Sequence, residues 1–377
     1  MDWLFVAGVL FFVLVLLVTV AIHEAGHMTA AKALKLDVPE YSVGFGPKLF
    51  TIRTKKTAYS LRAIPLGGFV LISDMRYPEK SYERTALSRV SPWKRQIVFF
   101  AGPAVNLVVG TAILLALLVA TPYQQQANYV GELNTCDSNT GCEAQKAGLE
   151  VGDKIVMIDG VPISNFEDIA PAKNGKEVIE TLIVERAGEE VTIKNLPLTL
   201  DKETGVSYMG IQATKEAYRT VGDAWTFVAF SFTENLKALA NLPEKVPAVL
   251  GNIVTGDKEA DDPASVVAAG KSYGDLASST EVPQDDKIFN FIYYSALFNI
   301  GIGLINLLPF LPLDGGRMWI ALCDSLKMRW AKIRKKEYQP VSQGMFGAMT
   351  AVSAVVVFGV MALVILSDVS AIVAGSI

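Results

Sequence analysis

The chain has 377 residues, a formal net charge of −4 and a hydrophobic fraction of 51%. The length would suffice for two or three soluble domains, but the hydrophobic fraction and a positive mean hydropathy exclude a purely soluble protein.

Four long stretches carry few charges, and each is near the ~20 residues that a helix needs to cross a bilayer core of ~30 Å. They are residues 3–22, 97–120, 289–311 and 346–366. The first could be a signal peptide, but it has no basic n-region and no clean small-residue cleavage site. We therefore interpret all four as retained transmembrane helices.

The charges between these stretches predict the topology. Residues 23–96 and the loop between the last two stretches are rich in lysine and arginine, whereas residues 121–288 are acidic. Basic loops stay in the cytoplasm, so both termini and the acidic middle segment should lie outside. The basic runs could instead suggest nucleic-acid binding, but spans on both sides make topology the better explanation. No nucleic-acid partner is expected.

After the first stretch, residues 41–74 are rich in β-branched and aromatic residues. "KLFTIRT" and "AYSLRAI" alternate and are separated by a polar turn, which indicates a β-hairpin. Two readings are open. The hairpin lies at the inner membrane surface or dips into it, or it is an ordinary cytoplasmic hairpin. The pattern alone does not separate these readings.

Two polar or helix-breaking residues lie inside the second stretch. Pro103 removes a helix hydrogen bond unless it sits in the first turn. Asn106 needs a partner in lipid, and such amides often join helices.

Residues 122–214 read as a compact α+β module. Alternating runs predict several strands, with turns at Asp159–Gly160 and Ala187–Gly188. Residues 215–288 contain an amphipathic helix that is expected along the outer membrane surface, and a polar loop with one short helix.

Three cysteines are present. Cys136 and Cys142 lie in the predicted outside segment, where a disulfide between them is plausible. Five residues that suit a tight turn separate the two. Cys323 lies near the inner face.

The chain's only two histidines stand at the end of the first stretch, in "HEAGH". Residues i and i+4 share one helix face, so His23 and His27 can offer two imidazoles to one zinc ion. Glu24 is placed to act on a metal-bound water as a general base. The alternative is a soluble helix with two surface histidines, but the apolar context argues against it.

A catalytic zinc site needs a third protein ligand, and no other histidine exists. Asp314 follows an apolar run broken by Pro309 and Pro312. It could merely cap the helix that begins at Gly315. Because the two-histidine site needs a third ligand, we choose Asp314, whose carboxylate can supply an oxygen. Cys323 is the less favoured alternative.

"HEAGH", "FFAGPAVN" and "NLLPFLPLDGG" resemble the signature segments of the site-2 protease family of intramembrane zinc metalloproteases. "AGLEVGDKIVMIDGVPI" resembles the centre of a PDZ domain, as in bacterial members that cut anti-sigma factors. The resemblance covers nearly the whole chain in order. The single module is more like the actinobacterial layout than the tandem PDZ domains of the Gram-negative type, and "DDPASVVAAG" departs from the pattern that such members often show.

The resemblance implies a fold, a site and a set of partners. The fold is a polytopic α-helical membrane protein with four transmembrane helices, a membrane-associated β-sheet and one extracytoplasmic PDZ-like α+β domain. The expected parts are two halves of a membrane core, 1–121 and 289–377, the PDZ-like domain at 122–214, and a post-PDZ segment at 215–288. The expected partners are the lipid bilayer and a single-span membrane substrate such as an anti-sigma factor.

The residue roles follow the same resemblance. One Zn²⁺ per chain would be held by His23, His27 and Asp314, with Glu24 as base and Asn306 contacting the substrate backbone or oxyanion. The substrate-binding candidates are Asn106, Leu66, Gly67, Gly68 and Phe69.

Two rival functions remain open at this point. A membrane PDZ scaffold would use a structural metal, which normally has four protein ligands. A metal transporter would use the same three ligands in transit, and a PDZ-like module fits that poorly.

Overall fold

The computed structural model describes residues 2–73, 91–134, 143–201, 204–259, 262–335 and 343–376. It contains two compact units. One comprises Met1–Leu117 with Trp225–Ile377, and the other is Leu118–Ala224. The predicted Cys136–Cys142 disulfide lies outside the described residues.

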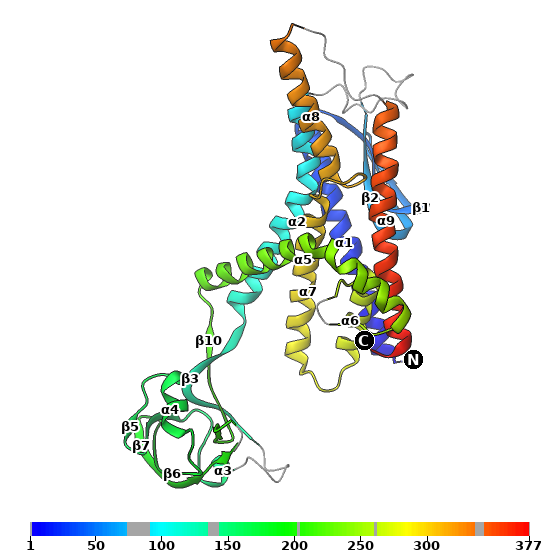
Figure 1. Ribbon diagram of the computed structural model, residues 1–377. Helices are drawn as coiled ribbons and strands as arrows, with labels where there is room; N and C mark the ends of the chain where they lie inside the picture. Colours follow the sequence, from blue (N-terminus) through cyan, green and yellow to red (C-terminus); the bar gives the residue numbers. More distant parts are fainter. Residues whose placement is uncertain are drawn as a thin grey trace. The chain divides into compact units, whose positions relative to one another are not determined.

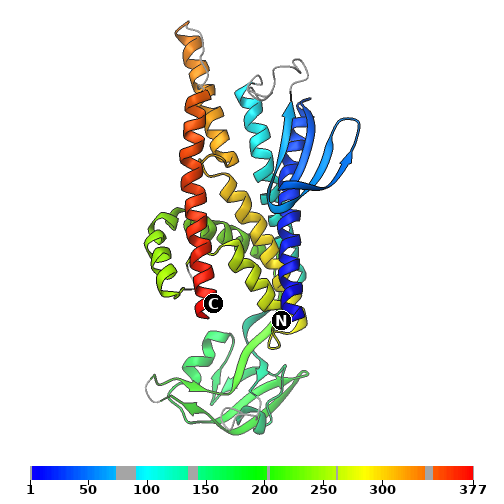
Figure 2. The same cartoon turned by 90° about the vertical axis from the view of Figure 1, so that its right-hand side faces the viewer.

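Within the described residues, four helices are long and apolar enough to cross a membrane, as the sequence predicted. They are α1 (Trp3–Ala33), α2 (Pro92–Ala120), α7 (Gln284–Asn306) and α9 (Gln343–Ala374) (Figures 1 and 2). The third span begins and ends five residues earlier than expected. Its end at Asn306 places Pro309 and Pro312 in the following loop, where their missing N–H groups cost no helix hydrogen bond.

Glycines allow these helices to approach closely. A Cβ at Gly26 of α1 would lie 2.4 Å from the backbone oxygen of Ala101 in α2. A Cβ at Gly110 would lie 2.8 Å from the backbone oxygen of Ala296 in α7. Small residues at such contacts let van der Waals packing hold membrane helices together.

The predicted hairpin is confirmed and is longer than expected, with β1 (Asp37–Arg53) antiparallel to β2 (Ala58–Ser73). The two strands pair twice. Val43 lies opposite both Leu61 and Gly68, so the first half of β1 is flanked by both halves of β2. Among the described residues, the resulting sheet has free edges at 48–53 and 67–73, and it lies beside α1 (Figure 2).

A polar network braces this sheet. Arg62 donates to Ser42 Oγ at 2.8 Å, to the Gly46 carbonyl at 2.8 Å and to Glu40 Oε1 at 3.0 Å. A hydrogen bond from Lys48, together with that from Arg62, lowers the pKa of Glu40. The guanidinium also lies 5.1 Å from the centre of the Phe69 ring, so one side chain connects the middle of the sheet to its 67–73 edge.

The segment expected as a basic loop after the third span is largely helical. Residues Asp314–Ile333 form α8, an amphipathic helix of 20 residues. Its charged residues suggested a loop, but they belong to a regular helix whose buried residues include Ala321 and Asp324.

The unit Leu118–Ala224 is an α+β fold. Its main sheet has the strand order β10-β3-β4-β6-β7, and β5 pairs with β4. The strands are β3 (Pro122–Leu133), β4 (Lys154–Ile158), β5 (Val161–Pro162), β6 (Val178–Arg186), β7 (Glu189–Pro197), β8 (Thr199–Leu200), β9 (Ser207–Tyr208) and β10 (Ile211–Tyr218). Short helices α3 (Glu143–Lys146), η2 (Phe166–Asp168) and α4 (Ile169–Lys173) complete the unit.

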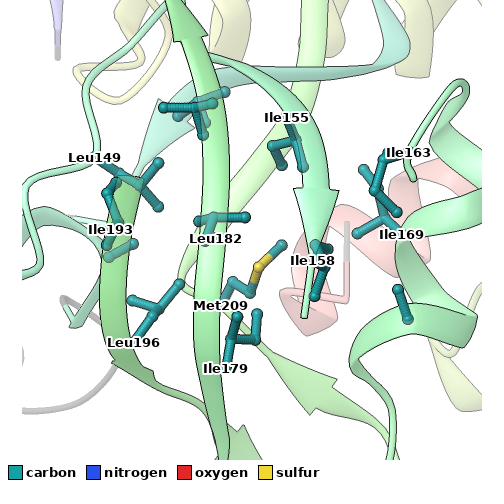
Figure 3. Close-up of a cluster of buried hydrophobic side chains, with 14 of the residues drawn as sticks. Leu149, Ile155, Ile158, Ile163, Ile169, Ile179, Leu182, Ile193, Leu196 and Met209 are labelled. Atoms are coloured by element: carbon teal, nitrogen blue, oxygen red, sulfur yellow. The ribbon is translucent and has the colours of Figure 1, made fainter. Parts of the chain in front are cut away.

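An aliphatic core holds this unit together. Strand residues such as Ile155, Ile179 and Leu182 are fully buried, and Figure 3 shows them converging from neighbouring strands. The predicted turns are confirmed. Asp159 and Gly160 both have positive φ, as do Ala187 and Gly188, which suits tight hairpin turns.

The segment after this unit is mostly helical. Helix α5 (Val221–Thr255) confirms and extends the predicted amphipathic helix, and α6 (Val266–Ser278) is the expected short helix. Buried Lys258, just after α5, pairs with buried Asp368 of α9. Asp368 Oδ2 also accepts the backbone N–H of Ser265 at 2.7 Å, so this segment is tied to the last span.

Candidate metal centre

His23 and His27 lie on one face of α1, as their spacing predicted. Both side chains are buried, and their Nε2 atoms are 3.2 Å apart. The two imidazoles therefore present one nitrogen each to the same point.

Asp314 brings the third donor from a distant part of the chain. Its Oδ2 lies 2.9 Å from His23 Nε2 and 3.0 Å from His27 Nε2. The reading of Asp314 as a helix cap is wrong. Helix α8 begins at Asp314 itself, its N-cap is Leu313, and the carboxylate is directed at the histidines. A carboxylate in the first turn is also favoured by the helix dipole.

Two glycines make this placement feasible. A Cβ at Gly315 would lie 2.3 Å from the carbonyl oxygens of Leu307 and Leu308. A Cβ at Gly316 would lie 2.5 Å from the backbone carbon of Phe310. The loop from the end of α7 therefore folds back directly onto the start of α8, which holds Asp314 at the end of the span.

Helix α2 supports the histidines from behind. His27 Nδ1 lies 2.7 Å from the Val98 carbonyl oxygen, so Nδ1–H donates there and Nε2 keeps its lone pair. A Cβ at Gly102 would lie 2.4 Å from His27 Nε2 and 2.9 Å from His23 Nε2, so only glycine leaves this space open.

Glu24 is buried beside the two histidines. Its side chain also borders the sheet, because a Cβ at Gly68 of β2 would lie 2.9 Å from Glu24 Cγ. The expected base thus stands between the three donors and the 67–73 edge of the sheet.

The other predicted residues lie in three different settings. Asn306 ends α7, and its Nδ2 donates to the Ile302 carbonyl at 2.9 Å. Gly67, Gly68 and Phe69 lie on the free edge of β2, together with the backbone of Leu66.

Asn106 is completely buried in α2, and neither of its side-chain polar atoms has a partner among the described residues. Its role in substrate binding stays a prediction. Cys323, the competing ligand, belongs to α8 and is not part of the cluster.

Sequence reasoning missed Val98, Gly102 and Arg317. The last lies three residues after Asp314, with its Nη1 4.0 Å from Asp314 Oδ1. Gly102 stood within the quoted "FFAGPAVN" segment, but nothing local showed that it faces the histidines. The Val98 contact uses a backbone carbonyl, which every residue has, so the residue type at this position does not reveal the contact.

The donor set fits zinc. Two imidazole nitrogens and one carboxylate oxygen lie within 4.8 Å of one another, all on buried residues. Three protein donors of these types leave a fourth position open, as in catalytic zinc sites. The Val98 bond fixes the His27 tautomer that a metal requires.

Comparison with known proteins agrees with this chemistry. The sequence profile described as peptidase family M50 matches residues 11–352. The zinc metalloprotease Rip1 of Mycobacterium bovis is 31% identical, over 97% of this chain and 98% of its own length. Rip1 of Mycolicibacterium smegmatis is 30% identical, over 86% and 87%. A putative zinc metalloprotease of Fusobacterium nucleatum is 31% identical, over 86% and 89%.

Proposed function

Because the chain belongs to peptidase family M50, the site-2 protease family, and is a zinc-dependent protease of the bacterial membrane, we propose that it cuts single-span membrane proteins within their transmembrane segments. One observation carries the proposal. Three buried metal donors and a buried glutamate converge on a helix that is apolar enough to cross the bilayer.

The chemistry is hydrolysis of a peptide bond. When bound, zinc supplies Lewis acidity towards a carbonyl oxygen and a nearby water. Glu24 takes a proton from the attacking water and delivers it to the leaving nitrogen. Glu24 is held on the same helix turn as His23, and its burial excludes bulk water.

The 67–73 edge of the sheet is the proposed docking place for the substrate backbone. A transmembrane helix hides its carbonyls in hydrogen bonds, so the segment to be cut must unwind. Adding the unwound segment to a free strand edge satisfies its backbone groups. This edge borders Glu24 through Gly68, whereas no other described strand pairs with it.

The sheet's surface supports the reading in which it dips into the membrane. Several of its large apolar side chains are exposed: Phe45, Leu49, Phe50, Ile52, Leu61, Ile64 and Leu71. Such a surface is costly in water and suits lipid. An ordinary cytoplasmic hairpin would place polar residues at these positions.

Asn306 and the soluble unit complete the proposal. Rotation of the Asn306 side chain away from its Ile302 bond would let it donate to the developing oxyanion. The unit Leu118–Ala224 is assigned as a PDZ-like domain outside the membrane, supported by its antiparallel sheet with short helices. Bacterial members of the family that this chain resembles cut anti-sigma factors, which are single-span membrane proteins. Anti-sigma factors are therefore the proposed substrates.

The scaffold and the transporter are less well supported. Among the described residues, the cluster offers three donors rather than the four of a closed structural site. A transporter would have no use for a buried glutamate beside the donors.

The Glu24→Gln variant tests the proposed function. The protein would be reconstituted in liposomes with a tagged single-span substrate. Glu24→Gln should abolish cleavage and keep its zinc, while the exposed control Glu216→Gln should cleave like the wild type. Cleavage by Glu24→Gln at the wild-type rate would contradict the proposal.

A further inference from the structure

A cation stands beside the metal centre, and the mechanism above gives it no role. Arg317 lies in the first turn of α8, and its Nη1 is 4.0 Å from Asp314 Oδ1. Asp314 uses its other oxygen, Oδ2, to meet the histidines. Arg317 therefore lies nearest the carboxylate oxygen that does not meet the histidines.

The Arg317 guanidinium has a neighbouring ring and carboxylate, but its hydrogen-bond donors are not used by them. Its Cζ lies 6.0 Å from the centre of the Phe99 ring, a distance at which a cation still gains from the ring. At 4.0 Å, its contact with Asp314 is longer than a hydrogen bond. Its side chain is 50% exposed, and none of its guanidinium N–H groups donates to another described residue. Its five donors are thus available to a further acceptor.

The charges of the site indicate what that acceptor is. The two carboxylates, Glu24 and Asp314, balance the two charges of a zinc ion, so Arg317 leaves one excess positive charge at the centre. Hydrolysis places a negative charge on the oxygen of the scissile carbonyl, first as an oxyanion and then as a product carboxylate. In a site of low dielectric constant, such a charge needs a fixed cation. Arginine suits a carboxylate because its planar fork can donate two parallel bonds.

We propose that Arg317 is a further catalytic residue, which donates N–H bonds to the oxygen of the scissile carbonyl as that oxygen becomes negative, and then to the product carboxylate. The water oxygen bonds to the carbonyl carbon, and the carbon–nitrogen bond breaks. One water proton passes through Glu24 to the leaving nitrogen, and the second passes to the released amine, so the products are a carboxylate and an ammonium group. Arg317 donates hydrogen bonds and transfers no proton in this scheme.

The competing role is purely structural. Arg317 could serve only to orient Asp314, three residues earlier on the same helix. The two roles differ in what they predict for the metal. An orienting residue is needed for zinc retention, whereas a residue that binds the reacting oxygen is not.

The test compares Arg317→Gln and Arg317→Lys with Arg329→Gln, an exposed arginine further along α8. Zinc content and kcat would be measured on the protein in liposomes. Arg317→Gln should keep one zinc per chain and lose about 100-fold in kcat, the loss typical of removing one donor to an oxyanion. Arg317→Lys should recover part of this loss, and Arg329→Gln should match the wild type.

A second measurement isolates the carboxylate. A peptide that ends at the cut position would be titrated against Glu24→Gln protein, once with a free carboxylate and once amidated. Adding Arg317→Gln should weaken binding of the acid about tenfold and leave the amide unchanged. Loss of zinc from Arg317→Gln, an unchanged kcat, or an equal effect on acid and amide would each overturn the proposal.

Discussion

His23 and Asp314 are 291 residues apart in sequence, yet their donor atoms are 2.9 Å apart in space. The histidine pair was predictable because helix periodicity alone places i and i+4 on one face. Asp314 was predictable only by elimination, since the two histidines needed an oxygen ligand. Val98 and Gly102 were not predictable, because contacts between helices leave no periodic pattern in either helix.

At the residue scale, Asp314→Ala should lose its zinc. The change removes one of three donors and leaves two imidazoles, which bind zinc far more weakly. Metal analysis of the purified variant should show zinc reduced at least tenfold, with Cys323→Ser retaining one ion per chain. Full zinc in Asp314→Ala together with loss in Cys323→Ser would move the third ligand to the cysteine.

At the scale of elements, strongly patterned segments were predicted and weakly patterned ones were not. The apolar spans and the alternating runs of the β1–β2 hairpin carry clear periods. The double pairing of β1 was not predictable, because register between strands depends on the bend near Gly44 and Gly46, both at positive φ. Helix α8 was considered only as a helix beginning at Gly315 with Asp314 as its cap, and the many charges that follow suggested a loop.

The free edge of the sheet should contact the substrate. A photo-crosslinking residue at Leu71, on the 67–73 edge, should capture substrate in the Glu24→Gln protein. The same residue at Leu49, which is also exposed but lies at the other edge, should not. Equal capture at both positions, or capture only at Leu49, would contradict docking beside Glu24.

Cys136 and Cys142 lie in the chain between β3 and α3, outside the described residues, and we expect a disulfide between them. A loop this short gives roughly 2 kcal/mol in the entropy model, so it should stiffen the loop without being needed for the fold. Replacing both with serine should leave proteolysis of a small substrate nearly intact. Mass spectrometry of the unreduced, alkylated protein decides the point, since finding both thiols alkylated would end the idea.

At the scale of the whole molecule, the uneven distribution of lysine and arginine predicts which segments lie on each side of the membrane. Positively charged segments are retained inside, so the unit Leu118–Ala224 should lie outside and the hairpin turn inside. In a variant without native cysteines, a cysteine replacing exposed Asn174 should react with an impermeant reagent in intact cells. One replacing Lys55 should react only after lysis. The reverse pattern would overturn the charge argument.

The position of the cut tests the central claim most directly. The wild-type protein would be reconstituted in liposomes with a single-span substrate, and mass spectrometry would identify both new termini. If His23, His27, Asp314 and Glu24 form the hydrolytic site, the new termini should lie inside the substrate's apolar segment. The products should be absent after zinc chelation and in the Glu24→Gln variant. Termini only in the soluble regions of the substrate, or products that persist without zinc, would contradict an intramembrane metalloprotease.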